Sequence, residues 1–267
     1  MYYPMDNIEN FRDLGGIRTS DGKQVKKAKL FRCAALAPAS QRDLERIKEL
    51  GIDTIIDFRS TREAESRKDP EIEGTEYHHI SLFKEKMEGV ERGGKEERFY
   101  EWMIKASFDD PDLFARQMVQ NYSTLISEEQ AVAGYRRFFQ VRIDESNEKI
   151  LWHCSIGKDR TGIAAILLLE ALDADRQMIR DNYLQTNLYL GRSIEEVMEK
   201  VKEKAGKHEH YEAIRDSFVM AMSASERFID ACYRTMNEKA GSPAAYLERY
   251  FGIDAGMKKL LKEKFCE

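Results

Sequence analysis

The spacing of apolar residues changes repeatedly along the first third of the chain. After Ser40, a good N-cap, apolar residues recur at helical spacing as far as Gly51, which suits the end of a helix. The short apolar run 54–58 is typical of a buried strand, and 77–82 has the same character. Because strands that alternate with helices usually pair in parallel, this pattern predicts an α/β fold with a central, mainly parallel sheet flanked by helices.

Residues 83–142 differ in character from the segments before them. Their first part is charged and contains Gly93 and Gly94, and an aromatic cluster follows. Over 112–141, apolar residues recur at helical spacing in two stretches that separate near Ser127. We predict a helical insertion over 83–142, whose aromatic residues either belong to the core or form a mobile lid over the functional site.

Capping signals mark further helices. Ser60 and Glu63 have the spacing of a capping box, and so do Ser223 and Glu226. Helix signals continue to the end of the chain, so we predict that 172–267 is a helical carboxy-terminal part packed on the same core.

The composition fits a single domain over 1–267, a length that is ample for one large core. A net charge of −5 argues against nucleic-acid binding, whose footprint is a basic domain. No apolar run approaches the roughly 20 residues of a membrane span, and the first residues lack the parts of a signal peptide. The four cysteines are scattered without disulfide or metal spacing, so we expect a reducing, cytoplasmic location.

One loop carries most of the candidate chemistry. It follows the apolar run 150–152, precedes a second apolar run at 163–169, and holds Cys154 at its start and Arg160 at its end. A tight turn from a strand into a helix points successive backbone N–H groups into one concavity, and the helix N-terminus adds positive charge. Such a concavity binds tetrahedral anions, and an arginine supplies a two-pronged donor for phosphate oxygens. The pattern therefore predicts a thiolate beneath a bound phosphate.

A thiolate in that position is suited to nucleophilic phosphoryl transfer. The leaving oxygen then needs a proton, and Asp159 is the nearest candidate donor, with Asp57 and the acidic pair 109–110 as alternatives. The Thr161 hydroxyl could donate to the cysteine sulfur, and Lys158 would add positive charge at the rim of the site.

Several segments, taken in order, resemble a known family. Cys154 and Arg160 are separated by five residues, as in the loop of cysteine-dependent phosphatases. The string HCSIGKDRTG over 153–162 resembles a bacterial branch of that superfamily with tyrosine-, serine- and phosphoinositide-directed members. The resemblance implies a protein tyrosine phosphatase fold and hydrolysis of a phosphomonoester through a phosphocysteine intermediate. The same branch has an amino-terminal signature, which three segments of this chain resemble in the same order: NFRDLGG at 10–16, LFR at 30–32 and DFRS at 57–60.

The resemblance also implies roles for single residues. Cys154 would be the nucleophile, Arg160 would bind the phosphoryl oxygens, and Asp159 would be the general acid. The other substrate-binding positions in the loop would be Ser155, Ile156, Gly157, Lys158 and Thr161. The supporting residues would be His153, Asp57, Arg12 and Asp13, although a plain salt bridge explains the last two equally well.

The histidines do not suggest a metal site. His78 and His79 are neighbours on a predicted strand and therefore point to opposite faces, and His208 and His210 have no convincing third ligand. We therefore expect neither a metal nor another cofactor.

Two other classes of function fit part of the pattern. A rhodanese-like sulfurtransferase also places a thiolate in such a loop, but its loop is usually shorter. An inactive phospho-binding module would keep Arg160 and could lose the nucleophile or the acid. We predict a metal-independent phosphatase whose substrate is a phosphorylated protein, a phosphoinositide or a small phosphate ester. The sequence does not indicate which substrate, nor an oligomeric state.

Overall fold

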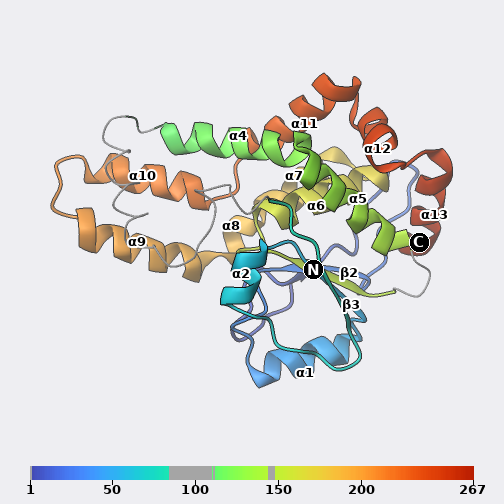
Figure 1. The fold of residues 1–267 in the computed structure, drawn as a ribbon, viewed down its shortest axis with the longest axis horizontal. Coiled ribbons are helices and arrows are strands. Elements are labelled where there is room, and N and C mark those ends of the chain that lie inside the picture. Colours follow the sequence, from blue (N-terminus) through green and yellow to red (C-terminus); the bar gives the residue numbers. More distant parts are fainter. Residues whose placement is uncertain (1, 84–109, 111, 144–147) are drawn as a thin grey trace.

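The computed structural model describes residues 2–83, 110, 112–143 and 148–267, which form one central sheet and the helices around it (Figure 1). Within these residues the sheet has five strands in the order β1-β2-β5-β3-β4. Only β1 is antiparallel to its neighbour, and the other pairs are parallel. This arrangement confirms the predicted α/β fold with a mainly parallel sheet. The strands are β1 (Arg12–Asp13), β2 (Leu30–Cys33), β3 (Thr54–Asp57), β4 (Glu76–His79) and β5 (Ile150–His153).

Parallel pairing brings the carboxyl ends of β2, β5, β3 and β4 to one edge of the sheet. Cys33 at the end of β2 lies opposite His153 at the end of β5. His153 lies opposite Asp57 at the end of β3, which in turn lies opposite His79 at the end of β4. Loops that leave this edge therefore lie close together, as at the ligand-binding edge of other open α/β sheets.

Each face of the sheet has its own hydrophobic core, because successive strand residues point to opposite faces. Leu151 of β5 belongs to the cluster that includes α1 (Gln41–Leu50). Its neighbour Trp152 belongs to the larger cluster built around α6 (Asp159–Ala171). Helix α6 is apolar on nearly every side because it is buried between the sheet and further helices.

Further helices extend this larger core, and two helices form a projecting part. Helix α11 packs along α4, and α10 contacts both α4 and α9, so α9 and α10 project away from the sheet together (Figure 1). Besides α1 and α6, the helices in the described residues are α2 (Thr61–Ser66), α4 (Leu113–Ser127), α5 (Glu129–Ile143), α7 (Arg176–Leu184), α8 (Thr186–Tyr189), α9 (Gly191–Ala205), α10 (Tyr211–Met222), α11 (Glu226–Ala240), α12 (Pro243–Phe251) and α13 (Ala255–Phe265).

Two of the helix starts expected from capping residues are confirmed. Ser40 caps α1 with a capping box, and Gly51 ends that helix in the left-handed conformation. Ser60 and Glu63 form the capping box of α2. Both helices follow strands of the sheet, so the capping residues determine where the chain turns from strand into helix.

The capping box predicted for Ser223 and Glu226 is wrong. Ser223 directly follows α10, and its backbone N–H still donates to the carbonyl of Val219. Ser225 is the N-cap of α11 instead, and its side chain accepts from the N–H of Arg227. Because Ser223 still belongs to the end of one helix, the serine nearer the next helix takes the capping position.

The predicted insertion is described only in part. Residues 84–109, which include the charged stretch and most of the aromatic cluster, lie outside the described residues. The two helices predicted over 112–141 are confirmed as α4 and α5, with the break near Ser127. Their side chains Tyr122 and Tyr135 belong to the same core cluster as α6. The division of the chain into an insertion and a carboxy-terminal part stays a prediction, and so does the lid.

Candidate active site

The candidate loop joins the end of β5 to the start of α6 at the carboxyl edge of the sheet. Cys154 begins the loop and is 2% exposed, and Arg160 in the first turn of α6 is 5% exposed. The two side chains are close enough to interact electrostatically. The fold thus brings together the thiol and the guanidinium that the sequence predicts to act on one phosphate.

Gly157 forms the tightest part of the loop. Its φ of +73° is left-handed, and a Cβ atom here would lie 2.3 Å from the carbonyl oxygen of Cys33. The Gly157 carbonyl accepts hydrogen bonds from Asn10 Nδ2 at 3.0 Å and from Arg32 Nη2 at 2.8 Å. Because the C=O and the N–H of one peptide point in opposite directions, these bonds turn the N–H of Lys158 to the other side of the loop.

Two more carbonyls of the loop are held in the same way. The Nδ1 atom of His153 lies 3.3 Å from the carbonyl oxygen of Cys154. The N–H of Ala35 donates to the carbonyl of Ser155 at 3.2 Å. Each of these contacts leaves the next N–H group facing the opposite side. Several N–H groups on one side of a short loop would form an anion-binding concavity, which stays a prediction here.

A buried carboxylate holds Arg160 in place. The guanidinium donates to both oxygens of Glu63, at 2.6 Å from Nη1 to Oε2 and 3.0 Å from Nη2 to Oε1. The Ser155 hydroxyl donates to Glu63 Oε1 at 2.5 Å and accepts from Arg160 Nη2 at 3.3 Å. Glu63 also accepts the N–H of Ser60 in the capping box of α2. A two-pronged ion pair fixes the plane of the guanidinium, as recognition of two phosphate oxygens requires.

Replacement of Glu63 by Gln is expected to lower the free energy of unfolding by about 3 kcal/mol at neutral pH, because Arg160 is then buried without its counter-charge. Burial acts to raise the pKa of Glu63, but the hydrogen bonds and charge of Arg160 outweigh it and lower the pKa from 4.5 to about 2. The stability that the ionised carboxylate contributes is therefore complete above about pH 4.5 and is lost as the pH falls toward about 2.

Urea unfolding at a series of pH values measures this effect. The difference in stability between the wild type and Glu63→Gln should shrink as the pH falls from 4.5 to about 2. The matched control is Glu65→Gln on the exposed side of α2, which should change the stability by less than about 0.5 kcal/mol. A difference that stays constant over this pH range would contradict the role given to the ion pair.

Asp159 is the first residue of α6, and its side chain is 28% exposed. Its Oδ1 atom accepts a hydrogen bond from the hydroxyl of Tyr122 on α4, at 2.7 Å. The Nζ atom of Lys158 lies 3.5 Å from the same oxygen. A partly exposed carboxyl group beside the loop can reach a leaving group, and its role as the acid stays a prediction.

Lys158 does not lie at the exposed rim of the site, where the sequence analysis places it. Its side chain is 2% exposed, and its ammonium group donates to the carbonyls of Ala221 at 2.5 Å and Ser223 at 3.3 Å. These carbonyls lie at the carboxyl end of α10, where backbone oxygens lack helical donors and attract a cation. The lysine therefore ties the loop to the projecting helices.

Two other loop positions add to this picture. The hydroxyl of Thr161 is buried and has no hydrogen-bond partner among the described residues, so the expected donation to the sulfur of Cys154 is not formed. Residue 161 lies on the inward side of α6, which accounts for its burial. Ile156 packs against a cluster from α4, α9 and α10 that includes Phe114 and Val201. An apolar side chain thus also connects the loop to the projecting helices.

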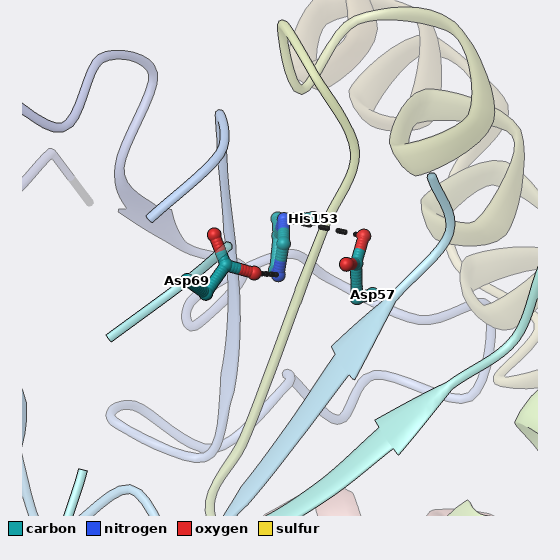
Figure 2. A group of neighbouring side chains, drawn as sticks. All are labelled: Asp57, Asp69 and His153. Carbon is teal, nitrogen blue, oxygen red and sulfur yellow. Dashed lines mark ion pairs between the residues drawn. The ribbon is translucent and has the colours of Figure 1, made fainter. Parts of the chain in front are cut away.

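His153 lies behind the loop, between two aspartates (Figure 2). Its Nε2 atom is 3.2 Å from Asp69 Oδ2 and its Nδ1 atom is 3.8 Å from Asp57 Oδ1, and all three side chains are buried. Burial alone would lower the pKa of His153, but the two carboxylates outweigh it and raise that pKa, which favours the imidazolium. An imidazolium has a proton on both nitrogens. Its Nδ1–H can therefore donate to the carbonyl of Cys154 and orient the loop.

The same three side chains are the group that could hold a metal in the described part of the chain. Ligand atoms of Asp57, Asp69 and His153 lie within 4.8 Å of one another. However, Nη2 of Arg59 lies 2.8 Å from Asp57 Oδ2 and 2.5 Å from Asp69 Oδ2. A guanidinium and an imidazolium already balance the two buried carboxylates, and a divalent ion would add charge to a balanced site. The group therefore fits an ion-pair network better than a metal, and the expectation of no metal stays a prediction.

Asp57 is poorly suited to donate a proton. It is fully buried, and its carboxylate accepts from Arg59 and from the hydroxyl of Tyr77 at 2.6 Å. Burial acts to raise the pKa of Asp57, but the charges of His153 and Arg59 hold it far below the usual range. This carboxyl group stays ionised, which favours the supporting role over that of the acid.

The acidic pair 109–110 is described at one position only. Asp110 is partly exposed, forms an ion pair with Arg116, and accepts from the N–H of Asp112 at 3.2 Å. These contacts belong to the start of α4. Residue 109 lies outside the described residues. Among the described candidates for the acid, Asp159 is thus the one that directly follows the loop in the chain.

Arg12 and Asp13 have different surroundings. Arg12 is buried, donates to Asn182 and Thr186 at 3.0 Å each, and also hydrogen-bonds the side chain of Asn10, whose amide holds the loop. Asp13 accepts from backbone N–H groups at residues 15 and 28, where the first strands turn. Arg12 therefore supports the loop through one intermediate residue, and Asp13 stabilises the turn.

Sequence reasoning missed several side chains that shape the site. Glu63 was predicted only as a capping residue and Tyr122 only as part of the apolar stripe of a helix, and Asp69 carried no signal beyond its residue type. Asn10 and Arg32 lie inside the strings that carry the family resemblance, and that resemblance was the available signal for them.

The arrangement is the one that cysteine-dependent phosphatases need, because a thiolate nucleophile requires a phosphate held directly above it by fixed donors. A comparison with protein families agrees: residues 3–267 match the tyrosine phosphatase family, and the chain belongs to that family. This membership confirms the family resemblance found in the sequence.

Two curated proteins are similar to this chain. It is 35% identical over 185 residues to H16_A0669 of Cupriavidus necator, a protein named as a tyrosine-protein phosphatase, and the match covers 68% of this chain and 62% of that protein. It is 23% identical over 267 residues to the triple specificity protein phosphatase PtpB of Mycobacterium tuberculosis, covering 94% of this chain and 92% of PtpB. The chain thus matches less than two thirds of the length of the first relative.

A solved structure is also similar, but distantly. The core catalytic domain of the PP-IP phosphatase SIW14 from S. cerevisiae is 12% identical, with a TM-score of 0.39, over 89% of this chain and 96% of that one. A likeness of this size bears on neither the fold nor the substrate.

Proposed function

We propose that this chain hydrolyses phosphomonoesters through a phosphocysteine intermediate, without a metal ion, and that Cys154 is the nucleophile. The observation that carries the proposal is the loop, in which the carbonyls of three residues are held by partners outside it and Arg160 is clamped by Glu63. Membership of the tyrosine phosphatase family supports it.

In the first step the Cys154 thiolate attacks phosphorus, an S–P bond forms, and the bond from phosphorus to the leaving oxygen breaks. Asp159 gives its proton to that oxygen, which leaves as an alcohol or phenol. In the second step a water molecule loses a proton to Asp159 and attacks phosphorus, and the S–P bond breaks to release inorganic phosphate and the thiolate. Arg160 and the N–H groups stabilise the charge on the phosphoryl oxygens in both steps.

The substrate is proposed at the level of chemistry: a phosphorylated protein, a phosphoinositide or a small phosphate ester. Each presents the same dianionic group to the loop. The name of PtpB, a triple specificity protein phosphatase, supports a site that accepts more than one class of phosphoprotein. Within the described residues, no helix has both the length and the apolar character to cross a bilayer. A cytoplasmic location stays a prediction.

Release of phosphate from para-nitrophenyl phosphate in the presence of a chelator tests the proposal. We expect the chain to release phosphate at the same rate with and without the chelator. Formation of a persulfide from thiosulfate without phosphate release would favour the sulfurtransferase instead. Binding of phosphate with no turnover of either compound would favour the inactive phospho-binding module.

A further inference from the structure

The acid of the loop has a partner on a distant part of the chain. The hydroxyl of Tyr122, on α4, donates to Asp159 Oδ1 at 2.7 Å and lies 2.7 Å from the hydroxyl of Tyr183, on α7. Both tyrosines are buried, with exposures of 0% and 1%. Two buried phenols in series at one carboxylate have no role in the mechanism given above.

The direction of these hydrogen bonds follows from the number of protons. A phenol has one proton to donate. Burial, and then the charge of Asp159, raises the pKa of Tyr122 well above its usual value, so the phenol keeps that proton. Since Tyr122 donates to the carboxylate, it accepts from Tyr183, and the chain runs from Tyr183 through Tyr122 to Asp159.

The two oxygens of Asp159 are therefore not equivalent. Oδ1 accepts from Tyr122 and also lies 3.5 Å from the ammonium group of Lys158. A proton on Oδ1 would meet a donor hydrogen and a positive charge, whereas Oδ2 accepts no hydrogen bond from the described residues. The contacts thus favour Oδ2 as the atom that carries the transferable proton.

The packing around Tyr183 shows how the three helices reach one another. Gly162 in α6 faces the Tyr183 ring, and a Cβ atom at that position would lie 3.2 Å from the ring. The rings of Tyr122 and Tyr183 meet edge to face, with centroids 6.1 Å apart, and the Tyr122 ring also packs against Phe228 at 5.3 Å. These contacts fix the Tyr122 hydroxyl in place.

We propose that Tyr122, supported by Tyr183, is a positioning residue for the general acid: it holds Asp159 Oδ1 so that Oδ2 faces the leaving group, and it stabilises the carboxylate that forms as the proton departs. The proposal rests on the proposed function, because it assumes that Asp159 is the acid. The proton moves from Oδ2 to the leaving oxygen as the P–O bond breaks, and the Tyr122 proton stays on its phenol throughout.

The test compares a substrate that needs the acid with one that needs it little. Phenyl phosphate has a poor leaving group and para-nitrophenyl phosphate a good one. Tyr122→Phe should lower kcat/KM for phenyl phosphate by about tenfold to a hundredfold, the size expected for a hydrogen bond to a charged group. For para-nitrophenyl phosphate the loss should stay below about threefold. The loss should appear in kcat and leave KM nearly unchanged.

Tyr246→Phe is the matched control. Its hydroxyl is also buried and donates to the carbonyl of Ile126, on the same helix as Tyr122 but away from Asp159. This variant should leave the ratio of the two substrates unchanged, although it loses a buried hydrogen bond to α4. An equal loss for both substrates in Tyr122→Phe would show that the residue is only structural and would overturn the inference.

The Asp159→Asn variant separates this inference from the proposed function. If its loss is largest for phenyl phosphate, Asp159 is the acid, and adding Tyr122→Phe should then cause little further loss. If Tyr122→Phe lowers kcat/KM for phenyl phosphate by the same factor in Asp159→Asn as in the wild type, the role of Tyr122 is overturned and Asp159 remains the acid. If Asp159→Asn shows no dependence on the leaving group, the assignment of the acid fails, and the inference fails with it.

Discussion

Replacement of Cys154 by serine is expected to reduce phosphate release from para-nitrophenyl phosphate by at least about a thousandfold, the scale seen when a covalent nucleophile is removed. A serine hydroxyl stays protonated at neutral pH and is a far weaker nucleophile than a thiolate. The loop should keep its anion-binding shape, because backbone N–H groups and Arg160 form it. Isothermal titration with tungstate, a tetrahedral anion, should therefore show that the variant still binds the ligand.

Cys266→Ser is the matched control for this exchange. Cys266 is another buried free cysteine, at the end of α13, and it belongs to no part of the loop. The control should keep wild-type turnover, even if its stability falls. Wild-type turnover in Cys154→Ser would contradict the covalent mechanism through Cys154. Loss of both turnover and tungstate binding would show that the exchange had disrupted the loop, and trapping of a phosphoenzyme in the wild type would then decide on the nucleophile.

The local parts of the site were predictable because they are written in consecutive residues. The strand before Cys154 and the buried helix that follows the loop were both predicted from short-range patterns. The parallel sheet also followed, since alternation of strands and helices constrains the pairing. In each case the physical cause, such as burial or backbone sterics, acts within a few residues of the position predicted.

The partners of the loop could not be predicted in the same way, because they come from far along the chain. Glu63 is 97 residues from Arg160, and its capping box gave it a sufficient local explanation. Lys158 was expected to add positive charge at the rim of the site, but the carboxyl end of α10 offers carbonyls that lie 63 and 65 residues away. Only the packed fold decides which distant group meets a charged side chain.

Replacement of Arg160 by lysine is expected to lower kcat/KM for para-nitrophenyl phosphate by about a hundredfold to a thousandfold, the size expected for loss of a fixed donor in the transition state. Lysine keeps the positive charge but cannot form the two parallel bonds that a guanidinium makes with phosphate oxygens. It also cannot bind both oxygens of Glu63 as Arg160 does, at 2.6 and 3.0 Å, so the remaining cation is less well oriented.

The steady-state parameters and two controls show which property of Arg160 is needed. Arg176→Lys exchanges the same residue types at an exposed ion pair on α7 and should leave kcat/KM unchanged. Glu63→Gln keeps the guanidinium but loses the charge that orients it, so its kcat/KM should fall by less than that of Arg160→Lys. If Arg160→Lys and the wild type differ by less than about threefold, positive charge alone suffices and the two-pronged contact is not used. If Glu63→Gln loses as much activity as Arg160→Lys, orientation of the guanidinium accounts for most of its contribution, and the buried pair is then as important for catalysis as for stability.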